Sequence, residues 1–181
     1  MHYFTTCPSP VGTLTLACDG GGCSLVGLWI EGQKYHGGAI AGSMAEDSGA
    51  PVLAAAKMWL GRYFAGEKPA ISELALAPIG SEFRQTVWQL LREIPYGEVA
   101  SYASIAQKAA ARMGRASMAS RAVGGAVGHN PISIVIPCHR VVGADGSLTG
   151  YAGGIGTKAR LLELEGAGMS SLFAPKKSTA P

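Results

Sequence analysis

Short β-prone runs alternate with turn residues along the first third of the chain. The runs cover residues 2–7, 13–17 and 24–30, and residues 8–12 and 19–22 between them are rich in glycine, proline and aspartate. Such runs separated by turn residues are typical of antiparallel hairpins. We therefore expect a small antiparallel meander. We further expect a loop over 34–50, a helix over 51–64 and a further strand over 71–77.

The character of the chain changes near residue 79, where a helical period of about 3.6 begins. Apolar side chains there fall on one helical face after a plausible N-cap at Ser81, namely Phe83, Val87, Leu90, Leu91 and Ile94. A second helix is expected to start after Ser101 and a third to run from Ser117 to Val127. A basic segment at 112–115 separates these two helices. Helix, basic turn and helix together predict a helix-turn-helix.

The two halves define the expected fold class, which is α+β. Residues 1–79 are expected to form an N-terminal α/β support domain with a small antiparallel sheet and a helix. Residues 80–168 are expected to form a mostly helical C-terminal domain that carries the chemistry. A strand over 132–136 and a last helix over 157–165 complete it, and residues 169–181 are expected to be a frayed tail.

Charge is distributed unevenly over the 181 residues. Net charge is +3, but residues 1–98 hold six Lys/Arg against nine Asp/Glu (−3), and residues 99–181 hold nine against three (+6). A one-sided basic field suits a polyanion, and a solvated basic face is the alternative. The first residues do not read as a signal peptide, and no apolar stretch approaches the length of a membrane span, so neither is expected. Four cysteines in this length do not suggest a disulfide framework, so a reducing cytoplasm is expected.

The most informative segment is the apolar run that ends at Pro137 and is followed by Cys138, His139 and Arg140. We expect a strand to deliver Cys138 to a stiff turn, where cationic or imidazole neighbours lower the pKa of its thiol. The alternative is a buried, inert cysteine. The third helix is unusual because Ala119, Ala122 and residues 124–126 leave it almost bare. It could fit closely into a groove, or it could pack against its own protein.

Several separated motifs agree in order with one family. They are Tyr-Gly-Glu-Val-Ala-Ser-Tyr at 96–102, Ser-Arg-Ala-Val-Gly-Gly-Ala at 120–126, Asn-Pro-Ile-Ser-Ile-Val-Ile-Pro-Cys-His-Arg-Val at 130–141, Leu-Thr-Gly-Tyr-Ala-Gly-Gly at 148–154 and Leu-Leu-Glu-Leu-Glu-Gly at 161–166. The chain resembles the O6-alkylguanine-DNA alkyltransferases over residues 81–166. Residues 1–80 match only loosely, through the segments at 9–14 and 60–64.

The resemblance implies a ribonuclease H-like N-terminal domain and a winged-helix-like helix-turn-helix. It also implies a reaction. Duplex DNA is bound in the minor groove, the damaged guanine is rotated out of the stack, and a thiolate takes the alkyl group from O6 irreversibly. O4-alkylthymine is a second implied substrate. A soft thiolate suits displacement at an sp3 carbon, and the target atom is unreachable inside a stacked duplex. The implied protein acts once, without a cofactor, as a monomer on double-stranded DNA.

The resemblance also assigns roles to residues of this chain. Cys138 is the nucleophile, His139 the base acting through a water, and Glu165 the group that orients His139. Asn130 holds the turn, and Tyr102 donates to the departing guanine. Arg121 fills the gap left by the flipped base. The other DNA-binding positions are Arg115, Ser120, Ala122 and Gly125, and the implied substrate pocket comprises Val127, Val141, Tyr151, Ala152 and Gly153.

Two departures and two alternatives accompany this resemblance. About five extra residues at 109–116 enlarge the turn between the expected second and third helices. A zinc site could draw on Cys7, Cys18, Cys23, His2 and His36, but their spacing matches no tight ligand pattern, so no metal is expected. The alternative functions are a Cys-His-Glu hydrolase or acyltransferase, and a non-catalytic lesion-binding relative.

Overall fold

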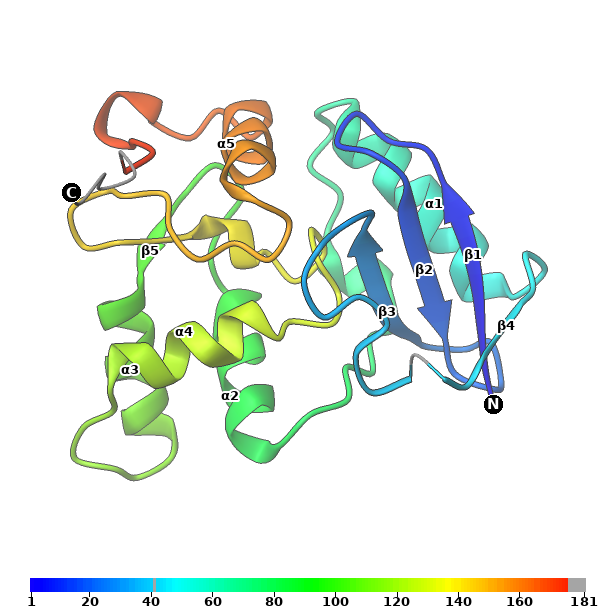
Figure 1. The fold of residues 1–181 in the computed structure, drawn as a ribbon, viewed down its shortest axis with the longest axis horizontal. Coiled ribbons are helices and arrows are strands. Elements are labelled where there is room, and N and C mark those ends of the chain that lie inside the picture. The colour runs from blue at the N-terminus through cyan, green and yellow to red at the C-terminus, as the bar shows by residue number, and fades with distance from the viewer. Residues whose placement is uncertain (41, 176–181) are drawn as a thin grey trace, which may run out of the picture.

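The computed structural model describes residues 1–40 and 42–175. The chain forms two halves that lie side by side, a sheet covered by one helix and a mostly helical half (Figure 1). The expected α+β class is confirmed. None of the helices among the described residues is long and apolar enough to cross a membrane.

The N-terminal sheet is built from a meander, as expected. Strands β1 (His2–Cys7), β2 (Leu14–Cys18) and β3 (Leu25–Ile30) pair antiparallel, and the full strand order is β3-β2-β1-β4. The short strand β4 (Met44–Glu46) pairs parallel with β1, inside the region expected to be a loop. Three residues are too few to show a period. Helix α1 (Pro51–Phe64) begins with proline at its first turn and packs on the sheet.

The expected strand over 71–77 is largely wrong. Residues Ile71–Glu73 form a 3-10 turn, and only Leu76 makes a bridge, to Leu25 of β3. The amide of Glu73 bonds to the carbonyl of Ala70, and its carboxylate accepts from the Ala70 amide. These local bonds take the first half of the segment away from the sheet.

The C-terminal half contains helices α2 (Glu82–Leu91), α3 (Tyr102–Arg112), α4 (Ser120–Gly128) and α5 (Ile155–Leu164). Ser81 and Ser101 cap α2 and α3 as expected. The expected cap at Ser117 is wrong. Gly114, at φ +63°, ends α3 with a bond from the Arg115 amide to the Ala110 carbonyl, and the chain stays in a loop until Ala119. The longer turn therefore shortens α4.

The segment 132–136 is not the strand that its isoleucines suggested. It folds on itself, with the Ile136 amide bonded to the Ile132 carbonyl at 3.0 Å and Ile134 at φ +70°. Only Ile132 makes a bridge, to Leu28 of β3. Every residue of the segment is buried, so its apolar character reflects burial on all sides rather than a sheet position. The next residues form a 3-10 turn (Cys138–Arg140), and strand β6 (Val141–Val142) pairs parallel with β5 (Ala100–Ser101).

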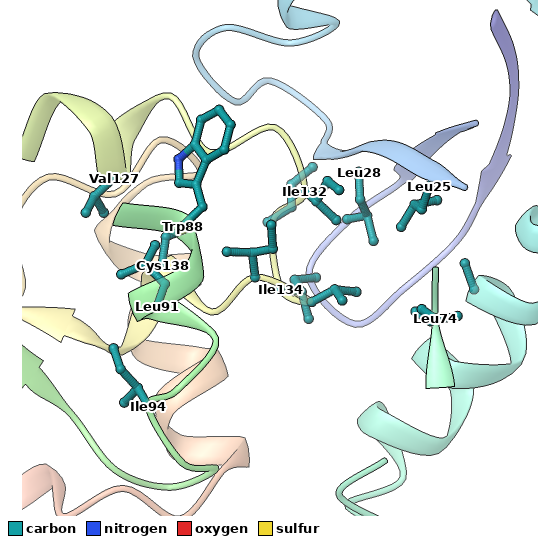
Figure 2. Close-up of a cluster of buried hydrophobic side chains, with 14 of the residues drawn as sticks. Leu25, Leu28, Leu74, Trp88, Leu91, Ile94, Val127, Ile132, Ile134 and Cys138 are labelled. Atoms are coloured by element: carbon teal, nitrogen blue, oxygen red, sulfur yellow. The ribbon is translucent and has the colours of Figure 1, made fainter. Parts of the chain in front are cut away.

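One hydrophobic core runs through both halves (Figure 2). Leu25 and Leu28 of the sheet belong to the same buried cluster as Ile132, Ile134 and Leu91 of α2. Trp88 of α2 is buried and donates from its indole nitrogen to the Ala126 carbonyl of α4 at 2.9 Å. The core therefore fixes α4 and the 131–138 segment relative to the sheet.

The start of the expected frayed tail is ordered against the body of the protein. Residues Met169–Ser171 form a 3-10 turn, and Phe173 bridges Ser147 with a 2.8 Å bond from the Leu148 amide to the Phe173 carbonyl. Leu172 packs on a small cluster with Val142 and Leu162. The rest of that expected tail, residues 176–181, lies outside the described residues.

Gly80 is required where the chain enters α2. A Cβ at this position would lie 2.4 Å from the buried Trp88 ring, which has no room to retreat. We expect Gly80→Ala to lower the free energy of unfolding by about 1–3 kcal/mol. Gly61→Ala in α1, where the added methyl meets open space, should be neutral or stabilising. Urea denaturation checks both, and equal effects of the two substitutions would contradict the packing argument.

Candidate functional site

Cys138 starts the 3-10 turn that follows Pro137 and is 4% exposed. Its sulfur accepts a hydrogen bond from the Asn130 side-chain amide at 3.1 Å. Burial raises the pKa of the Cys138 thiol, and the Asn130 bond and the charge of Lys158 only partly oppose this. The expected lowering of the thiol pKa by His139 and Arg140 is therefore wrong. The thiol is protonated at neutral pH and needs a base to become a nucleophile.

Asn130 holds the cysteine turn in place, as the resemblance implies. It follows the end of α4, and its Nδ2 donates to the Ile136 carbonyl at 2.8 Å as well as to the sulfur. Its Oδ1 accepts from the Ile132 amide at 3.0 Å. One side chain thus ties the end of α4 to both ends of the 132–138 segment, which fixes the sulfur relative to the helix.

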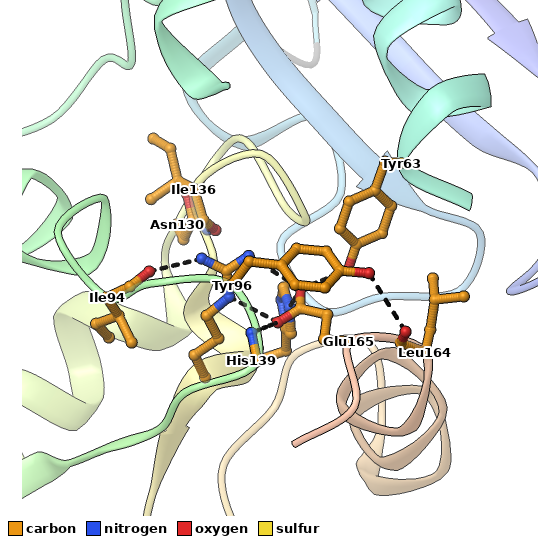
Figure 3. Close-up of polar contacts among 10 residues, drawn as sticks. Tyr63, Ile94, Tyr96, Asn130, Ile136, His139, Leu164 and Glu165 are labelled. Carbon is orange, nitrogen blue, oxygen red and sulfur yellow. Dashed lines mark hydrogen bonds and ion pairs between the residues drawn. The ribbon is translucent and has the colours of Figure 1, made fainter. Parts of the chain in front are cut away.

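His139 is fully buried and pairs with Glu165, which follows the last turn of α5 (Figure 3). Nε2 of His139 lies 2.7 Å from Oε1 of Glu165. Burial lowers the pKa of His139, and the Glu165 carboxylate opposes that shift. The buried Nδ1 has no hydrogen-bond partner among the residues that the structure describes. A neutral ring bonded through Nε2–H to Glu165 leaves Nδ1 free to accept a proton.

The Glu165 carboxylate is the most heavily bonded group of the site. Arg140 donates to it twice, from Nε to Oε2 at 2.8 Å and from Nη2 to Oε1 at 3.0 Å. The Tyr63 hydroxyl donates to Oε1 at 2.6 Å, and the Gly97 amide donates to Oε2 at 3.3 Å. Burial alone would raise the pKa of Glu165, but its bonds to His139 and Arg140 outweigh this and hold the pKa well below its ordinary value.

Two further polar groups, Lys158 and Tyr102, meet at the Thr149 carbonyl. Lys158 of α5 is fully buried and donates to the carbonyls of Val141 and Thr149. Burial lowers its pKa to about 8, against the opposing effect of Cys138. The Tyr102 hydroxyl also donates to the Thr149 carbonyl, at 2.9 Å, and burial raises its pKa to about 12. Tyr102 is therefore a protonated donor next to the cysteine.

The expected substrate pocket is only partly assembled in this conformation. A hollow of about 210 Å³, open to solvent, lies between the glycines of α4 and the 150–152 loop, with Tyr151 and Ala152 on its wall. Gly153 lies next in the same loop, whereas Val127 and Val141 are buried in the core. Lys34 and Tyr35 of the N-terminal half also line the hollow, and Tyr35 stacks on His129 at 4.0 Å between ring centroids.

All five expected DNA-binding residues are exposed to solvent. Arg121 and Ala122 lie in the first turn of α4, and Val123 and Ala126 of the same helix are buried against the core. The small residues therefore form a smooth outer face with one long cation. The exposed set is Arg115, Ser120, Arg121, Ala122 and Gly125.

Three residues of the site were given no role by sequence reasoning. Tyr63 and Lys158 lie inside the expected helices over 51–64 and 157–165, and the sequence indicates nothing more about them. Arg140 was noted only for its charge. Only the folded structure reveals their role, because the contacts join distant parts of the chain. Tyr63, for example, lies 102 positions from Glu165. Among the described residues, no three His, Cys, Asp or Glu side chains are grouped to hold a metal ion.

The low pKa of Glu165 makes the stability of the fold dependent on pH. Its stabilising charge is fully present above the ordinary pKa of 4.5 and is lost as the pH falls toward the folded-state value. Glu165→Gln leaves Arg140 buried without its counter-charge, so we expect a loss of about 3–5 kcal/mol at pH 7. Urea unfolding should show that the difference in free energy of unfolding between the wild type and Glu165→Gln becomes smaller below pH 4.5. A gap that stays constant from pH 7 to pH 3 would contradict the network.

Comparisons with known proteins agree with this geometry. Residues 2–78 match the family model of the 6-O-methylguanine DNA methyltransferase ribonuclease-like domain, and residues 82–167 match that of the DNA binding domain. Methylated-DNA–protein-cysteine methyltransferases of Haemophilus influenzae and Mycobacterium tuberculosis are 42% and 46% identical, over 90% and 91% of this chain and 86% and 93% of theirs. The crystal structure of M. tuberculosis OGT in complex with DNA superposes with a TM-score of 0.77 at 44% identity, covering 91% of this chain and 92% of that one. This chain belongs to the 6-O-methylguanine DNA methyltransferase family.

Proposed function

We propose that this protein repairs DNA by moving the alkyl group of O6-alkylguanine in a duplex onto Cys138, once per molecule. The observation that carries the assignment of residues is a buried thiol followed directly by a histidine. Its Nε2 is bonded to Glu165, and its Nδ1 has no partner in the described part of the chain. The similarity to methylated-DNA–protein-cysteine methyltransferases supplies the reaction. O4-alkylthymine is a second substrate under the same proposal.

The reaction proceeds as a proton transfer followed by a displacement. His139 Nδ1 takes the thiol proton, through one water, and Glu165 stabilises the resulting imidazolium. Cys138 Sγ then forms a bond to the alkyl carbon while the bond from that carbon to O6 breaks. The electron pair leaves with guanine, which takes up a proton. Tyr102 is the proposed donor, and its hydroxyl exchanges its bond to the Thr149 carbonyl for one to the guanine. The product is a thioether, and its thiolate is a poor leaving group, so the alkyl group stays on Cys138.

The proposed DNA contact uses the smooth outer face of α4. Side chains no larger than alanine allow the helix backbone to approach a groove closely, and Arg121 is long enough to occupy the space of an extruded base. Cys138 is buried, so the base has to enter the hollow lined by Gly124, Gly150 and Tyr151 and displace part of that loop. The M. tuberculosis relative was solved in complex with DNA. We further propose that the protein acts as a monomer in the cytoplasm, where its four unpaired cysteines stay reduced.

A Cys-His-Glu hydrolase or acyltransferase is the second candidate, because the same three residues could serve acyl transfer. Such an enzyme would release its product and turn over. Single-turnover stoichiometry therefore separates the two candidates. A non-catalytic lesion binder is disfavoured because the nucleophile position holds Cys138.

The first test measures the alkyl acceptor. Incubation with a duplex that contains one O6-methylguanine should add one methyl group to the peptide that carries Cys138, at no more than one per protein molecule. Peptide mass spectrometry measures this, and Cys138→Ser should abolish the transfer. An unmodified Cys138 peptide, or several lesions repaired per molecule, would rule the proposal out.

The second test separates base extrusion from chemistry. Arg121→Ala should slow repair of an O6-methylguanine duplex by about tenfold, because the extruded state loses a side chain that offsets part of its cost of a few kcal/mol. Attack on free O6-benzylguanine should be unchanged. Arg62→Ala is the control, since the Arg62 side chain is 43% exposed and pairs with Glu67 and Glu73 on the N-terminal half. Equal slowing of both reactions by Arg121→Ala would remove the extrusion role.

A further inference from the structure

We infer that Tyr63 of the N-terminal half is a positioning residue of the alkyl-transfer site, which it serves by fixing the Glu165 carboxylate that orders His139. The inference rests on the proposed function and goes beyond it, because it places part of the working site in the ribonuclease-like domain. Tyr63 lies near the end of α1 and points across the boundary between the two halves toward Glu165 (Figure 3).

The contact is short and buried. The Tyr63 hydroxyl donates to Oε1 of Glu165 at 2.6 Å, and Tyr63 is 1% exposed. The same oxygen accepts from His139 Nε2 and from Arg140 Nη2. Three donors thus surround Oε1, and each fixes one direction of approach. Burial and the nearby Glu165 charge raise the pKa of Tyr63 far above its ordinary value, so the hydroxyl stays a donor at every working pH.

Packing positions the Tyr63 ring without help from its hydroxyl. The ring stacks on Trp59 at 5.5 Å between centroids and meets Phe64 and Tyr96 edge-on. Phenylalanine would therefore keep these contacts, and the single loss would be the bond to Glu165. The hydroxyl is a specific polar addition to an aromatic cluster that can pack without it.

Loss of this bond has a predictable effect on His139. With one donor fewer, the carboxylate interacts more strongly with the imidazolium form of His139, which raises the pKa of the histidine. Oε1 is also freer to turn toward Arg140, which loosens the orientation of the ring. Both effects lower the fraction of His139 that is neutral and correctly oriented to accept the thiol proton at and below neutral pH. The titratable and charged groups that face this pair are Cys138, Arg140, Lys158, Tyr63, Tyr96 and Tyr151.

The test compares Tyr63→Phe with the wild type in the reaction with O6-benzylguanine, which needs no DNA contact. The saturating rate at neutral pH should fall about tenfold, as loss of a bond to a charged group implies. The acid limb of its pH profile should move to higher pH by about half a unit, and the concentration for half-maximal rate should stay the same. In a Glu165→Gln background the Tyr63→Phe substitution should have no further effect on the rate.

Tyr96→Phe is the matched control. Its hydroxyl donates to the Leu164 carbonyl at 3.3 Å and its ring touches the same cluster, so it should leave the pH profile in place. NMR titration of His139 gives a readout that needs no alkyl transfer, and its pKa should rise in Tyr63→Phe. Superimposable pH profiles and an unchanged His139 pKa in a folded variant would overturn the inference. An inactive wild type would instead refute the proposed function, and the NMR result would still decide the role of Tyr63.

Discussion

The buried carboxylate of Glu165 is the interaction on which the arrangement of the site depends. It collects donors from α1, from the turn before β5 and from the turn that starts at Cys138, and it lies itself at the end of α5. Removing a charge from water is costly, and one partner would not offset that cost. Five donated bonds and the charge of Arg140 do so here, and Arg140 is anchored in turn to the Ile94 carbonyl. Elements distant in sequence are thereby held in one geometry.

The electrostatics favour a protected nucleophile over a permanently reactive one. Burial keeps the Cys138 thiol protonated, and burial also keeps His139 neutral. A preformed thiolate would be open to oxidation and to other electrophiles. A buried thiol that stays protonated in the free protein suits a protein that can react a single time. Asn130 and Lys158 then supply the hydrogen bond and the charge that stabilise the sulfur anion.

Within the C-terminal half, helices α2 and α3 could be predicted from sequence better than the segment that carries Cys138. The starts of α2 and α3 could be predicted from Ser81 and Ser101, because an N-cap bonds only to backbone amides of its own first turn. The strand expected over 132–136 is wrong because β-branched residues suit both a strand and a segment buried on every side. The turn that forms instead is closed by bonds from the Asn130 side chain, which the apolar pattern does not indicate. Cys138, His139 and Glu165 were identified through family motifs, and the structure brings the last two into contact. Tyr63 could not be identified, because no local pattern separates a tyrosine that packs from one that also donates.

The protonation of His139 tests the central claim most directly. The account requires a neutral ring at pH 7 with its proton on Nε2, donated to Glu165, and with Nδ1 bare to receive the thiol proton. Nitrogen-15 chemical shifts of the histidine ring, measured on the unreacted wild-type protein, report the occupancy of each nitrogen. A protonated Nε2 and an unprotonated Nδ1 are the predicted result. A proton on Nδ1, or on both nitrogens, would contradict the account.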